Sequence, residues 1–135
     1  MEILLVRESE ANTSKIARFL KKRHVRKIFP RNIFIHSTME KDVSKVAYII
    51  RDVIENKIVH EYEYLVDKID VFFKKDNVEE RDILVTDLDE IKKILKFVKN
   101  KYGINFDRRK KIEKGSIISV PINNGNKVAE KIFTL

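Results

Sequence analysis

The side chains that could do chemistry in this 135-residue sequence are three histidines, several carboxylates and two runs of basic residues. His36 and Ser37 follow a short apolar run, which would place an imidazole near the carboxyl end of a strand, where α/β proteins bind ligands. Such an imidazole could act as a nucleophile or base, but a structural histidine with a satisfied hydrogen bond is the more frequent case at such a position. His60, Glu61 and Glu63 could hold a metal ion, but such neighbours are also ordinary on a strand. We favour the structural interpretation for both and predict no metal or cofactor.

The two basic runs are candidates for binding a polyanion, because the net charge is +8 and the isoelectric point is about 9.6. The first run consists of Lys21, Lys22, Arg23, Arg26 and Lys27, and the second of Arg108, Arg109, Lys110 and Lys111. Phe29 and Phe106 lie beside these runs and could stack on bases. The alternative is a Lys-rich solvated surface with both rings in the core. The composition is thus compatible with an RNA or DNA partner without requiring one.

Several classes of protein are excluded by composition. The absence of cysteine excludes disulfide scaffolds, thiolate zinc sites and cysteine nucleophiles. Three glycines cannot build a glycine-rich phosphate loop. No apolar run approaches the roughly 18 residues of a transmembrane helix, and the early acidic residues do not fit a signal peptide. We therefore expect an intracellular protein, cytoplasmic or nuclear, without a membrane partner.

Three short apolar runs predict the strands of a parallel sheet, at residues 3–6, 33–36 and 83–86. Each is followed by apolar residues at helical spacing. This pattern predicts a helix after residues 12–14, a second over 43–54 that runs to about Asn56, and a third over 91–98. Asp87 and Asp89 are typical of the start of the last helix, and Gly103 of its end. Lys92, Lys96 and Lys99 form a stripe on its polar side. The segment 58–73 is compatible with either a strand or a helix.

Residues 116–122 and 127–133 predict a hairpin with Asn124 and Gly125 in its turn. Because strands and helices alternate along the chain, the predicted fold class is α/β. We expect residues 1–135 to form a single three-layer domain with a mainly parallel sheet and a C-terminal antiparallel hairpin.

The stretch LLVRESEAN at residues 4–12 resembles the start of the histidine phosphatase (phosphoglycerate mutase-like) superfamily. That family continues its first strand with Arg-His-Gly-Glu and often with Ser-x-Ala-Asn. Residues 33–50, 64–69, 82–95 and 121–128 resemble further family segments in the same order. The family's insertion before the last parallel strand is almost absent, so the resemblance implies a shortened member.

The resemblance also assigns roles to individual positions. Arg7 and Lys41 stand where the family has its phosphate-binding arginines, and these two are the expected phosphate-binding remnant. Ser37 and Thr86 stand at positions where the family has serines. Asp67 stands at the position of the family's acidic residue, and Asp87 at the position of its second histidine. Arg7 is followed directly by Glu8, so the nucleophilic histidine has no counterpart.

The family reaction needs an imidazole that accepts the phosphoryl group, with cations around the phosphate oxygens. Asp87 would instead place a negative charge about 4 Å from a phosphate, which costs several kcal/mol at an effective dielectric near 20. The resemblance therefore implies a catalytically inactive protein.

We predict an interaction module that binds a protein partner, as a subunit of a larger protein or nucleoprotein assembly. One alternative is a small basic nucleic-acid-binding α/β domain, since residues 32–38 and 60–73 loosely resemble Alba-like proteins. The other alternative is residual binding or turnover of a phosphorylated ligand by Arg7, His36 and Lys41.

Overall fold

The computed structural model describes residues 2–9, 13–24, 32–36, 59–62, 69–70, 81–122 and 125–134. Its strands are β1 (Glu2–Arg7), β2 (Asn32–His36), β3 (Val59–Tyr62), β4 (Arg81–Thr86), β5 (Ile117–Pro121) and β6 (Glu130–Phe133), and its helices are α1 (Thr13–His24) and α4 (Leu88–Tyr102). Residues 69–70 are also helical. The helix predicted over residues 43–54 lies outside the described residues.

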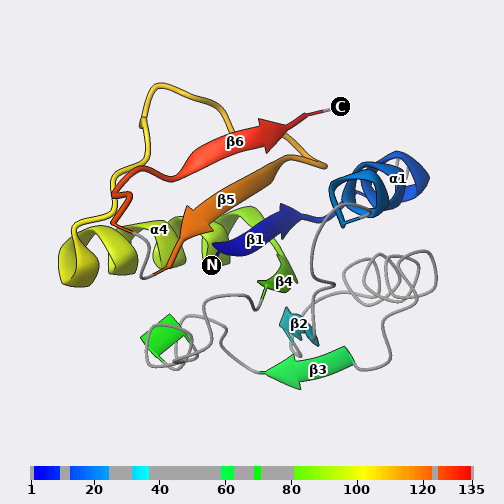
Figure 1. The fold of residues 1–135 in the computed structure, drawn as a ribbon, viewed down its shortest axis with the longest axis horizontal. Coiled ribbons are helices and arrows are strands. Elements are labelled where there is room, and N and C mark those ends of the chain that lie inside the picture. Colours follow the sequence, from blue (N-terminus) through cyan, green and yellow to red (C-terminus); the bar gives the residue numbers. More distant parts are fainter. Residues whose placement is uncertain are drawn as a thin grey trace.

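The strands form one six-stranded sheet in the order β3-β2-β4-β1-β5-β6 (Figure 1). The pairs β3–β2, β2–β4 and β4–β1 are parallel, whereas β5 is antiparallel to both β1 and β6. The sheet confirms the predicted α/β class, with a mainly parallel sheet and a C-terminal antiparallel hairpin.

The two faces of the sheet carry separate hydrophobic clusters, because successive side chains of a strand point to opposite sides. Leu4 and Val6 of β1 pack with Ile16, Ala17 and Leu20 of α1. The other face joins Ile3 and Leu5 to Ile91, Ile94 and Val98 of α4. The sheet thus lies between two helices, which confirms the three-layer arrangement.

Both ends of α4 are fixed by capping residues. Asp87 is the N-cap, and its carboxylate accepts a hydrogen bond of 2.8 Å from the backbone N–H of Glu90. Gly103 is the C-cap in the left-handed region, at φ 69°. There the N–H groups of Gly103 and Ile104 donate to the carbonyls of Lys99 and Val98, at 3.1 and 3.2 Å. This cap turns the chain back beside the helix it has just completed.

Two sequence predictions change in detail. The ambiguous segment 58–73 contributes β3 and the helical residues 69–70, so it contains both kinds of structure. The second hairpin strand begins at Glu130 and not at Lys127, because Val128 forms a separate bridge with Asn105. There the N–H of Asn105 donates to Lys127, and that of Ala129 donates to Asn105, both at 2.8 Å.

Candidate functional site

The carboxyl ends of β1, β2 and β4 lie at the same edge of the sheet. Arg7, the last residue of β1, is paired in register with Thr86, the last residue of β4. His36 ends β2, one residue beyond the pair formed by Ile35 and Val85. Three residues singled out from the sequence therefore end adjacent parallel strands, at the edge where such sheets usually bind ligands.

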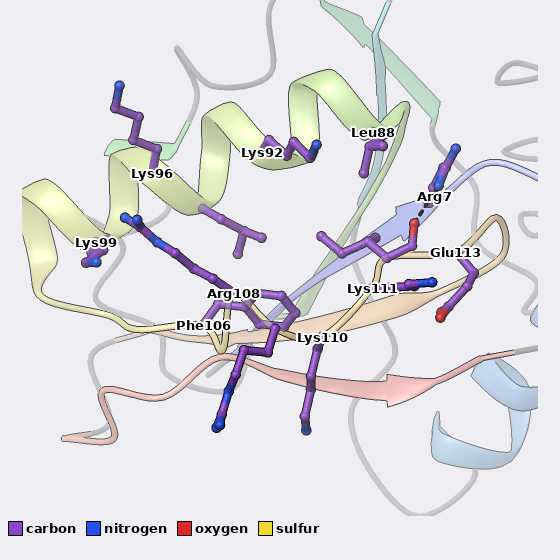
Figure 2. A pocket seen from close by; sticks show the side chains of 13 residues that line it. Arg7, Leu88, Lys92, Lys96, Lys99, Phe106, Arg108, Lys110, Lys111 and Glu113 are labelled. Atoms are coloured by element: carbon purple, nitrogen blue, oxygen red, sulfur yellow. Dashed lines mark hydrogen bonds between the residues drawn. The ribbon is translucent and has the colours of Figure 1, made fainter.

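Arg7 is tied to the segment that leads into β5. Its Nη1 donates a hydrogen bond to the carbonyl of Ile112 (Figure 2). Its backbone N–H donates to Ser116 and its carbonyl accepts from Gly115, both at 3.0 Å. The buried Nε has no hydrogen-bond partner within the described part of the chain. Nη1 of the guanidinium is thus occupied by the protein itself, whereas Nε has no partner among the described residues.

Glu8 follows Arg7 and brings a carboxyl group to this edge. Its backbone N–H donates to Thr86 at 3.1 Å. Its Oε2 is buried, as is the hydroxyl of Thr86, and neither atom has a hydrogen-bond partner among the residues described. Burial raises the pKa of Glu8, and the negative charge of Asp87 adds to this, while its own backbone hydrogen bond, Arg7 and Lys114 oppose the shift. The favourable interactions of the ionised carboxyl group therefore do not offset the cost of burying its charge.

A cavity of about 670 Å³ opens beside Arg7, between α4 and the segment 105–113. We call this space the basic groove. Its walls are Arg7, Leu88, Lys92, Leu95, Lys96, Lys99, Phe106, Arg108, Arg109, Lys110, Lys111, Ile112 and Glu113. Figure 2 shows the three lysines along α4, with Phe106, Arg108 and Lys110 on the segment across from them and Arg7 at one end. Among the residues that the structure describes, the lining joins eight basic side chains to apolar side chains and includes one carboxylate.

The second basic run is therefore gathered into one surface, as its expected anion-binding role requires. All four of its residues, Arg108, Arg109, Lys110 and Lys111, are exposed and line the basic groove. The lysine stripe of α4 joins them, and sequence reasoning had not connected the two features. The sequence feature that could have connected them is Gly103. A glycine C-cap reverses the chain, which brings the residues that follow it back toward the helix.

The other predicted residues that the structure describes do not line this groove. In the first basic run, Lys22 is exposed on α1, and Lys21 and Arg23 belong to the same helix. Asp87 is the N-cap of α4, which agrees with the capping interpretation of the Asp87 and Asp89 pair. The predicted residues Arg26, Lys27, Phe29, Ser37, Lys41 and Asp67 lie outside the described residues.

Neither a metal site nor a membrane span is evident in the described segments. Within them, no three His, Asp or Glu side chains come together as metal ligands would. Neither α1 nor α4, nor any other helix that the structure describes, combines the length and apolarity that crossing a bilayer requires.

The architecture defines the class: this is a histidine-phosphatase-like fold. A phosphoglycerate mutase from Plasmodium falciparum superposes with a TM-score of 0.65 and 14% sequence identity, over 97% of this chain and 89% of that one. A putative phosphohistidine phosphatase, SixA from Agrobacterium tumefaciens, superposes with a TM-score of 0.59 and 9% identity, over 99% of this chain and 96% of that one. No family model matches the sequence, and no curated protein matches it.

Proposed function

We propose that this chain is a catalytically inactive histidine-phosphatase-like module that acts by binding partners within a larger assembly. The observation that carries the proposal is the position of Glu8. Glu8 directly follows Arg7, the last residue of β1, so the nucleophilic imidazole that the family resemblance implies has no counterpart, and a carboxyl group lies next to Arg7 instead. A carboxylate there repels a phosphate, and it cannot form the phosphorylated imidazole on which the family reaction depends.

Two further features of the same edge support inactivity. Asp87 takes the expected position of the second histidine, and its carboxylate accepts the hydrogen bond from Glu90 that caps α4. Arg7 retains a cation, but its Nη1 donates to Ile112. A phosphate arriving here would meet two carboxyl groups and a guanidinium already engaged in part.

Phosphatase assays test the proposal. We expect hydrolysis of p-nitrophenyl phosphate, and of a phosphohistidine peptide, to remain at the rate measured in buffer. Arg7→Ala is the diagnostic variant and Arg108→Ala is its control, since Arg108 is an exposed residue of the segment after α4 and does not end a strand. Turnover well above buffer that disappears in Arg7→Ala and persists in Arg108→Ala would reject the proposal. If hydrolysis persisted in Arg7→Ala, it would come from a site other than the carboxyl ends of the parallel strands.

A further inference from the structure

We propose that the basic groove binds a single strand of nucleic acid, with phosphates along the lysines of α4 and a base against Phe106. This inference goes beyond the proposed function and does not depend on catalytic inactivity. It rests on the charge of the groove, the spacing of its cations and the apolar surface between them.

Most cations of the groove have no ion-pair partner in the part of the chain that the structure describes. Lys92, Lys96, Lys99, Arg108, Lys110 and Lys111 form no ion pair with any residue that the structure describes. Arg109 pairs with Asp107 at 3.2 Å. The single carboxylate of the lining, Glu113, is engaged by Lys131 at 3.0 Å. Six exposed cations thus share one groove in need of an external counter-charge.

The spacing of the cations suits a linear polyanion. A rise of 1.5 Å per residue separates Lys92 from Lys96 by about 6 Å along the helix and Lys96 from Lys99 by about 4.5 Å. Like charges at these intervals destabilise a helix when no anion is present. A chain of phosphates along α4 relieves that repulsion at several points, whereas a small anion relieves it at one.

The apolar part of the lining distinguishes nucleic acid from other polyanions. Leu88, Leu95 and Ile112 line the groove together with Phe106. Phe106 is partly buried and packs against the core cluster under α4, so its ring is held in place before a ligand arrives. A base offers a flat face to such a ring, whereas polyphosphate or a sulfated sugar does not.

The shape of the groove favours a single strand over a duplex. Helices that read duplex DNA project into its major groove. Here α4 forms a wall of the groove, and its opposite side is buried through Ile91, Ile94 and Val98. Because residues 105–113 stand across the groove from the exposed side of α4, they obstruct the entry of this helix into a duplex, whereas a single strand can lie between the two walls (Figure 2).

Fluorescence anisotropy with labelled oligonucleotides tests the inference. The probes are mixed-sequence RNA and DNA single strands of about ten nucleotides, a usual length for such grooves, and the corresponding DNA duplex. We expect single strands to bind more tightly than the duplex, and the affinity to fall between about 50 and about 200 mM salt. Comparing the two single strands shows whether the sugar matters, and binding of either supports the proposal. No binding of single strands at low salt, or tighter binding of the duplex, would overturn it.

A charge reversal in the groove provides the matched comparison. Lys96→Glu/Lys99→Glu should weaken binding about tenfold, the usual effect of losing two exposed ionic contacts. It should also lower the slope of log affinity against log salt by about 0.7 per lost contact. Lys15→Glu/Lys127→Glu changes the net charge equally at exposed positions outside the groove and should bind nearly as the parent does. An equal loss of affinity in both double variants would show that the oligonucleotide is attracted by net charge alone. That result would contradict binding in the basic groove.

Phe106→Leu tests the contact with a base. It should weaken single-strand binding about fivefold and leave binding of inorganic polyphosphate unchanged. Equal losses for both ligands, or none for the oligonucleotide, would overturn the assignment of a base to this ring. Circular dichroism and thermal unfolding establish that each variant is folded, and the lysine variants, which alter exposed side chains, decide the groove's role independently of Phe106→Leu.

Discussion

The guanidinium of Arg7 donates a hydrogen bond to the main-chain carbonyl of Ile112, so the end of β1 holds a segment 105 positions further along the sequence. The same segment is bound to Arg7 through the backbone of Gly115 and Ser116. Because Ile112 lines the basic groove, these contacts fix one wall of the groove to a central strand of the sheet. Arg7 thereby supports the shape of the surface that the basic groove forms.

Arg7→Met should destabilise the protein by about 1–3 kcal/mol, because it leaves the Ile112 carbonyl without its donor at a partly buried site. Urea denaturation measures this change. Arg108→Met is the matched control, since Arg108 is exposed and has no ion pair within the described segments, and its effect should stay within about 0.5 kcal/mol. Equal effects of the two substitutions would show that the contact with Ile112 contributes nothing to stability.

Glu8→Gln should stabilise the protein at neutral pH by an amount on the order of 1 kcal/mol, because an uncharged amide replaces a carboxylate whose ionised form is disfavoured by burial. The pKa of Glu8 is raised by burial, so the folded state favours its protonated form. The stability that the protonated carboxyl contributes is fully present below the pKa that Glu8 has in the unfolded chain. It is lost as the pH rises through the pKa of Glu8 in the folded protein. The stability gained by Glu8→Gln should therefore grow from acidic to neutral pH in urea denaturation experiments.

The matched control for this experiment is Glu130→Gln, at an exposed position of β6. Its effect on the free energy of unfolding should stay within about 0.5 kcal/mol, as is usual at exposed positions. If Glu8→Gln behaved in the same way, the carboxyl of Glu8 would not be held in an unfavourable environment.

Gly103→Ala should cost about 1 kcal/mol, because φ is 69° at this position and a Cβ disfavours left-handed backbone. A Cβ built there meets no atom within 4 Å, so the cost comes from the backbone alone and not from a clash. Thermal unfolding measures it. Gly103→Asn should be milder, since asparagine tolerates this conformation better, and equal costs would point to a cause other than the dihedral angle.

Asp70→Asn should lower the pKa of Tyr102, which partial burial and the hydrogen bond to the Asp70 carboxylate raise to about 12. Ultraviolet titration of tyrosinate, with Tyr102→Phe as the reference, follows this group among the four tyrosines. Because the folded pKa is raised, the parent protein should lose stability as the pH rises from about 10 toward 12. Asp70→Asn should lose less over that range, and an unchanged tyrosine titration would contradict the assigned hydrogen bond.

Local sequence signals predicted most of the described elements. The runs around Leu4 and Leu84 are apolar throughout because strands buried on both faces need no polar positions. Asp87 and Gly103 marked the ends of α4 because each supplies a specific backbone requirement. The start of β6 was predicted too early, since the bridge between Val128 and Asn105 is a long-range contact that no local pattern encodes.

The candidate site was predicted only in part. The role of Arg108–Lys111 followed from charge, but its convergence with the α4 lysines depends on the path of the chain after Gly103. The engagement of Arg7 by Ile112 and the orphaned carboxyl oxygen of Glu8 depend on tertiary packing. Neither spacing nor composition carries information about such contacts.

The place of β1 within the sheet also affects how the protein can be made. β1 forms hydrogen bonds with β4 on one edge and with β5 on the other. Both partner strands are synthesised much later than residues 2–7. Until residues 81–121 have left the ribosome, the nascent chain presents a buried-type strand with both edges open, which is a template for intermolecular pairing. Translation that stalls before residue 117 would leave this strand exposed on one side, and we expect such fragments to depend on chaperones or to be degraded.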